Sequence, residues 1–171
     1  MRAAVLVATL ALGACGSGGG ETAANNAATA AAPEGLAAGQ WELTSEVTSF
    51  AATDGPAGID TPVGTRATWN VCVEADRPPP AMFGGEGFDC QYRDYYGRNG
   101  RLGTTLNCRR EGLNGDMSFN AQGRFGADEL EFTQSISTFL AGQGDFNREA
   151  RVTGRRTGEC VAAAPAGNSA G

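Results

Sequence analysis

The stretch CQYRDYYGRNGRLGTTLNC, residues 90–108, decides the fold of this chain. Two runs in which large and polar side chains alternate flank the segment GRNGR, residues 97–101. Glycine and asparagine are the residues that enter left-handed backbone conformations most readily, and tight hairpin turns need such conformations. We therefore predict a β-hairpin with its turn centred on Asn99.

A turn at this position fixes which side chains of the two strands face one another, because residues equidistant from the turn are partners. The expected partners are Tyr92 with Leu106, Tyr96 with Leu102, Asp94 with Thr104, and Cys90 with Cys108. The hairpin thus predicts Asp94 on the same face as Tyr92 and Tyr96.

The same period of two recurs along the rest of the chain from residue 39 to residue 158, which is typical of half-buried strands. It appears in GQWELTSEVTSF (39–50), TRATWNVCV (65–73), DMSFNAQGRF (116–125), ELEFTQSIST (129–138) and REARVTGRRTG (148–158). We predict an all-β fold, an antiparallel meander of about seven strands. The sheet is expected to curve or to close partly into an up-and-down barrel, because a long meander must hide its edges.

The first fifteen residues, MRAAVLVATLALGAC, have the pattern of a bacterial lipoprotein signal. A positive residue precedes a short apolar run, and Leu12-Gly13-Ala14 leads into Cys15. We expect residues 1–14 to be removed and Cys15 to be acylated, which anchors the protein to a membrane. Gly16 stands where a sorting aspartate would stand, which favours the outer membrane of a Gram-negative bacterium and a periplasm-facing protein.

Composition divides the remainder into three parts. Residues 15–38 are rich in Gly, Ala and small polar residues and are expected to be a flexible tether. Residues 39–160 are expected to form one domain, and residues 161–171 a disordered tail.

The charged residues exclude several functions. The chain has no histidine and no lysine, so a histidine general base, a Ser-His-Asp triad and a lysine Schiff base are excluded. Its formal net charge of −6 argues against nucleic acid as a partner. No glycine-rich segment has the strand–loop–helix context of a phosphate site, so no cofactor is expected. We expect a protein that is not an enzyme.

Four cysteines remain beside Cys15, and an even number in an exported chain predicts disulfides. Their spacing lacks the close pairs of zinc sites, so no metal is expected. Four cysteines allow three connectivities, and the sequence does not choose among them. We expect Cys72–Cys90, which closes the Pro- and Gly-rich loop 74–89, together with Cys108–Cys160, which encloses the C-terminal strands.

Several short motifs together resemble a family of exported proteobacterial proteins called DUF3617, a domain of unknown function. They are GQWELTSEV at 39–47, VCV-E at 71–74, FDC at 88–90, LNC at 106–108 and GRRTGEC at 154–160. The resemblance covers residues 36–160. It implies an envelope location and four cysteines, and it implies no activity.

Three groups of side chains are candidates for a site. The carboxylates Asp128, Glu129 and Glu131 fit a solvated turn better than an acid–base pair. The aromatic residues are expected in an ordinary core or, alternatively, around an apolar ligand, with Tyr95 at the surface: Trp41, Trp69, Tyr92, Tyr95, Tyr96 and Phe119. Arg156 shares the inward parity of Val152, and a structural ion pair with Asp94 is one hypothesis.

These observations favour a non-catalytic, lipid-anchored envelope module that binds or supports an envelope protein. The alternative is a lipocalin-like carrier of a small apolar ligand. A cavity lined by the aromatic residues would favour the carrier, and a filled core would favour the binding module.

Overall fold

The computed structural model describes residues 33–57, 59–74, 77–84 and 87–160 of the 171-residue chain. It separates into two units, Met1–Ala30 and Ala31–Gly171, and the fold described below belongs to the second. The expected signal segment 1–14, the acylated Cys15, most of the tether and the tail 161–171 lie outside the described residues.

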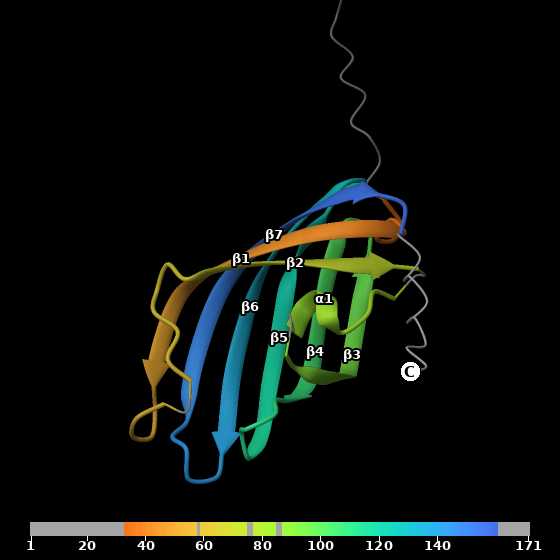
Figure 1. The fold of residues 1–171 in the computed structure, drawn as a ribbon. Helices are drawn as coiled ribbons and strands as arrows, with labels where there is room; N and C mark the ends of the chain where they lie inside the picture. The colour runs from red at the N-terminus through yellow and green to blue at the C-terminus, as the bar shows by residue number, and fades with distance from the viewer. Residues whose placement is uncertain (1–32, 58, 75–76, 85–86, 161–171) are drawn as a thin grey trace, which may run out of the picture. The chain divides into compact units, whose positions relative to one another are not determined.

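One antiparallel sheet dominates the second unit (Figure 1). Its strands are β1 (Gly39–Ala52), β2 (Arg66–Val73), β3 (Asp89–Arg98), β4 (Arg101–Arg109), β5 (Gly115–Phe125), β6 (Glu129–Leu140) and β7 (Phe146–Gly158). Their order across the sheet is β2-β1-β7-β6-β5-β4-β3, and the sheet curls into a half-barrel. The predicted all-β fold with about seven antiparallel strands is confirmed. Strands β3 to β7 form a meander, and the β1–β2 hairpin adds to it beside β7.

The sheet has a concave face that holds the core and an outer face that is mostly polar. The alternation predicted from sequence explains this division, since successive side chains of a strand point to opposite faces. The most deeply buried strand side chains include Trp41, Leu43, Val73, Leu106, Met117, Phe119, Phe132 and Val152. They come from both halves of the sheet, so the curvature closes one core rather than two.

A short segment between β2 and β3 fills the concave face. It contains the single-turn helix α1 (Ala81–Gly84), which contacts β5 and both edge strands, β2 and β3. Met82 and Phe83 are fully buried there, and the Phe83 ring lies 5.4 Å from that of Phe132. We call the described residues 77–84 the plug.

Hydrogen bonds from both edge strands fasten the plug. The Trp69 indole of β2 donates to the Ala81 carbonyl at 3.1 Å, and the Tyr92 hydroxyl of β3 donates to the Pro78 carbonyl at 2.6 Å. A buried carbonyl costs free energy if it is left without a donor, so these aromatic side chains contribute polar as well as apolar contacts. The plug therefore bridges the two edges that the open sheet leaves apart.

The predicted register of the β3–β4 hairpin is confirmed in the first half of β3 and is shifted by one residue in the half next to the turn. Tyr92 faces Leu106, as predicted, and Asn99 has a φ of 54° in the turn. However, the register shifts between Tyr92 and Asp94, because Arg93 is an extra residue in a β-bulge.

Between the bulge and the turn, each β3 side chain points to the face opposite the one expected. The expected positions of Asp94, Tyr95 and Tyr96 were therefore wrong. Asp94 faces Thr105 on the outer face, and Tyr96 faces Gly103 and is exposed. Tyr95 is half-buried against the core and was expected at the surface.

The expected disulfide pairing was wrong. Cys90 is bonded to Cys108, its direct partner across the hairpin, and Cys72 is bonded to Cys160. The physical reason is proximity. Cys72 is the second-last residue of β2 and Cys160 lies just after β7, and Gln40 of β1 is a register partner of both Cys72 and Gly158. The long-range pairing of β1 with both neighbours brings these cysteines together.

The tether ends earlier than expected. Leu36, assigned to the tether by composition, is buried in the core, and the Ala37 carbonyl accepts a 3.0 Å hydrogen bond from the Trp41 indole. The Pro33 carbonyl accepts another from the amide of Gly100. One apolar side chain and two hydrogen bonds are enough to bind this segment to the domain.

Candidate functional site

Two adjoining hollows lie along the outer face of the sheet. The first, of about 480 Å³, is lined from β1, β5, β6 and β7, and the second, of about 810 Å³, is lined from β3 to β6. Arg124 and Glu131 line both, so the hollows are direct neighbours. We call the two together the outer groove.

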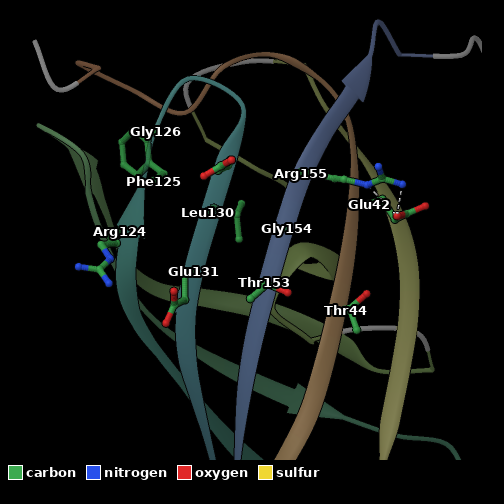
Figure 2. A pocket seen from close by; sticks show the side chains of 11 residues that line it. Glu42, Thr44, Arg124, Phe125, Gly126, Leu130, Glu131, Thr153, Gly154 and Arg155 are labelled. Carbon is green, nitrogen blue, oxygen red and sulfur yellow. Dashed lines mark hydrogen bonds and ion pairs between the residues drawn. The ribbon is translucent and has the colours of Figure 1, made fainter. Parts of the chain in front are cut away.

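The first hollow is lined by both polar and apolar residues, and three of its charged side chains, Glu42, Glu131 and Arg155, are in ion pairs (Figure 2). Arg155 of β7 reaches across to Glu42 of β1, at 2.8 Å between Nη2 and Oε1. Thr44 and Thr153, which face each other across the β1–β7 pair, present hydroxyl groups between these charges and Glu131. This end of the groove offers donors and acceptors on a flat surface, with no nucleophile and base in contact.

The second hollow exists because a glycine interrupts a row of longer side chains. Gly103 lies between Tyr96 of β3 and Gln122 of β5 in the register, and a side chain at Gly103 would meet open space. Asn120 and Thr133 also line this hollow. It therefore combines an exposed aromatic ring with amide and hydroxyl groups.

Three arginines gather where the β3–β4 and β4–β5 pairs meet, and two of them, Arg101 and Arg124, line the outer groove. Arg98 is the register partner of Arg101, and Arg101 is the register partner of Arg124, so their side chains share the outer face. Arg98 lies over the Tyr96 ring, with 5.1 Å from its guanidinium carbon to the ring centroid. We call these three residues the arginine cluster.

The arginine cluster differs from the other outer arginines. Arg66, Arg109, Arg151 and Arg155 each form an ion pair with a carboxylate of a neighbouring strand. Among the described residues, no ion pair includes a member of the arginine cluster. Glu131, the register partner of Arg124 on β6, is paired with Arg151 instead. Like charges placed side by side across strands are destabilising, so the three adjacent arginines repel one another without an ion pair to a described carboxylate.

The hypothesis of an ion pair between Arg156 and Asp94 is wrong. Arg156 pairs with Glu159 at 2.6 Å and donates from Nε to the Ala38 carbonyl, and its guanidinium lies against Gly39. Asp94 accepts a hydrogen bond from the Thr105 amide on the outer face. Two causes separate them: the β3 bulge turns Asp94 outward, and three strands lie between β3 and β7.

The other sequence candidates divide between core and surface. Trp41, Trp69 and Phe119 are core residues, and the half-buried Tyr92 and Tyr95 rings pack on Phe83. Glu129 and Glu131 line the outer groove, and Glu131 is paired with Arg151 at 3.0 Å. No sequence argument singled out the arginine cluster. Its only signal is a basic residue on each side of the β3–β4 turn and one just before the β5–β6 turn, which strand pairing brings into one patch.

Neither a membrane span nor a metal centre emerges from the part of the chain that the structure describes. No helix there is long and apolar enough to cross a membrane. Likewise, no three of its Cys, Asp and Glu side chains are arranged to hold a metal ion.

The fold defines the class of this protein: an all-β half-barrel with a plugged concave face and two disulfides. The model of the DUF3617 family, described as a protein of unknown function, matches residues 36–160, and the chain belongs to this family. A search of curated proteins and a search of solved structures each found no match. The matched range begins at the buried Leu36 and ends at the disulfide-bonded Cys160.

Proposed function

We propose that this chain is a non-catalytic binding module of the bacterial cell envelope, and that its outer groove docks a protein partner with an acidic surface. The arginine cluster is the observation that carries this proposal, because its three charges lack carboxylate partners among the described residues. A carboxylate-rich partner would relieve the repulsion between them and gain charge-assisted hydrogen bonds.

The composition of the groove favours a protein partner. Tyrosine and arginine are enriched in protein interfaces, and Tyr96 is exposed beside Arg98, Arg101 and Arg124. Tyr96 presents its ring without a large loss of side-chain entropy, since Arg98 already covers one of its faces. The chain itself is acidic, with a net charge of −6, so a local basic patch also gives orientation to an approaching acidic protein.

Photo-crosslinking in living cells tests the docking surface. A photoreactive residue at Gln122, on the floor of the second hollow, is expected to capture a protein partner, whereas one at the exposed Asn70 of β2 is not. Capture is expected to fall with R101Q/R124Q and to persist with R66Q/R109Q, which also removes two outer arginines whose partners, Glu46 and Asp116, lie outside the groove lining. Equal capture from Gln122 and Asn70, an unchanged yield in R101Q/R124Q, or capture of glycan or lipid alone would contradict the proposal.

We further propose that Cys15 is acylated and that the module faces the periplasm from the outer membrane. The support is the sequence Leu12-Gly13-Ala14-Cys15 after a short apolar run, followed by Gly16. Labelled palmitate is expected in the native chain and not in Cys15→Ala. Incorporation that survives Cys15→Ala would refute acylation at this residue.

A carrier of a small apolar ligand is the second candidate function. Its support is the set of half-buried rings on the concave face, where Tyr92 and Tyr95 lie 5.7 Å apart beside Phe83. The burial of Met82 and Phe83 in the same space weighs against it. Copurification of a neutral lipid with the native protein, lost when Phe83 is replaced by Trp, is the result that would favour a carrier.

A further inference from the structure

Arg148, on the concave face opposite the outer groove, is a further arginine that forms no ion pair with a described residue. Arg148 of β7 has the inward parity of Ala150 and Val152, and it is half-buried on the concave face. Its Nη2 donates to the Gln134 side chain at 2.7 Å. Its Nε is buried and has no hydrogen-bond partner. Buried polar groups are rarely left unpaired, so an unpaired Nε needs an explanation.

The charge of Arg148 is also uncompensated. No ion pair among the described residues includes it, and the nearby charge is that of another arginine, Arg110. Burial first, and then the charge of Arg110, lower the pKa of Arg148, yet a guanidinium keeps its proton at any physiological pH. The Phe88 ring, which Arg110 covers, packs on Phe119 at 5.1 Å, and Phe119 and Arg148 are both register partners of Ile136. The two cations therefore lie in the same region of the concave face, an arrangement that an anion would stabilise.

Gln134 holds the Arg148 guanidinium in a fixed position. Its side chain is only 3% exposed, and its amide nitrogen donates to the Phe83 carbonyl of the plug. Its oxygen accepts from Arg148. An amide tied at both ends restricts the guanidinium before any ligand binds, which lowers the entropic cost of binding.

Apolar side chains surround the two cations. Arg148 lies between Phe50 of β1 and Ile136 of β6 in the sheet register, and the Phe50 ring stacks on Phe146 at 5.3 Å. Arg110 lies over the Phe88 ring, with 5.2 Å from its guanidinium carbon to the centroid. A ligand bound to both arginines would therefore carry its charge at one end and an apolar body at the other.

We propose that Arg148 and Arg110, with Gln134 as the positioning residue, form a binding site for a small amphipathic carboxylate at the concave face. The carboxylate would pair with the two guanidinium groups, and the apolar body would lie against Phe50 and Phe88. The site is on the face opposite the outer groove, so it does not depend on the proposed docking function.

Calorimetry and thermal denaturation of the full chain with four probes test this site. Octanoate is expected to bind and to raise Tm, whereas octanol lacks the charge, octylamine carries the opposite charge, and acetate lacks the apolar body. Arg148→Met is expected to weaken octanoate binding by about tenfold or more, because it removes hydrogen bonds to a charged group. Without ligand, its Tm is expected to equal or exceed that of the native chain, since a buried unpaired charge is removed.

Two further variants keep the test decisive. Arg110→Gln changes an exposed side chain, so it is expected to fold normally and to weaken octanoate binding. Arg151→Met, on the outer face of the same strand, is expected to leave the Kd for octanoate unchanged. An unchanged Kd in both Arg148→Met and Arg110→Gln, an equal response to octanol or acetate, or no binding of octanoate would each overturn the proposal.

Discussion

Cys72 and Cys160 are joined by a disulfide at the end of the β2–β1–β7 part of the sheet, with their Cα atoms 5.4 Å apart. The bond fastens an edge strand to the strand on the far side of β1. It closes a loop of 88 residues, whereas Cys90–Cys108 closes one of 18.

The two disulfides are expected to contribute unequally to stability. In the chain-entropy model the longer loop contributes about 4–5 kcal/mol and the shorter about 3 kcal/mol. Urea unfolding of C72S/C160S is therefore expected to give a lower free energy of unfolding than that of C90S/C108S. Non-reducing peptide mapping provides the control, and a peptide joining Cys72 to Cys90 would contradict the pairing itself.

Replacing Phe83 by Ala is expected to destabilise the domain severely. Its ring is 1% exposed and packs on Phe132, Tyr92 and Tyr95, so its removal leaves a cavity under the plug. We expect a loss of about 3–5 kcal/mol in the free energy of unfolding. Phe139→Ala on β6 is the matched control, since Phe139 is 69% exposed and a loss below about 0.5 kcal/mol is expected. Similar losses in both variants would argue against the plug as part of the core.

Stability is expected to fall in alkaline solution because of Tyr92. Burial raises the pKa of its phenol above the ordinary value, with the Tyr95 charge adding to the rise and Arg77 opposing it. The unfolded chain releases this proton above about pH 10, whereas the folded chain retains it, so stability is full below pH 10 and declines above it.

The measurement is the urea midpoint at pH 8 and pH 11 for the native chain and for Tyr92→Phe. The native chain is expected to lose more stability between these two values than the variant, which has no phenol at this position. Tyr92→Phe is also expected to be about 1 kcal/mol less stable at pH 8, because the Pro78 carbonyl loses its donor. A pH response that is the same in both proteins would assign the alkaline loss to other groups.

Gly100→Ala is expected to weaken the β3–β4 hairpin. Gly100 has a φ of 70°, a conformation that costs an alanine about 1–2 kcal/mol. Gly103→Ala serves as the comparison, because Gly103 lies in the strand and its added methyl group would meet open space. Thermal denaturation is expected to show a lower Tm for Gly100→Ala only, and a larger effect at Gly103 would be inconsistent with this turn.

Local features of the sequence were enough to predict the strands and much of the hairpin register. The period of two predicts which side chains face the core, and the pairing of Tyr92 with Leu106 follows from the length of one turn. Cys90 was likewise expected opposite Cys108, although the pairing preferred on loop composition was another. These predictions succeed because they depend on residues close in the chain.

The candidate sites could not be predicted from these local features of the sequence. The arginine cluster brings together Arg98, Arg101 and Arg124 from three strands. The Arg148 site depends on Gln134, and nothing in the sequence distinguishes this residue from other inward-facing positions of a strand. A single extra residue, Arg93, was enough to reverse the faces of Asp94 and Tyr95.

The sequence by itself determined the all-β class, the antiparallel hairpins, the four paired cysteines and the family. Only the tertiary structure decided that β1 pairs with β7, that Cys72 joins Cys160, and that the plug fills the concave face. The physical reason is the range of the interactions. Alternation and turn residues act over a few positions, whereas closing the half-barrel depends on contacts between strands more than a hundred residues apart, which no local pattern encodes.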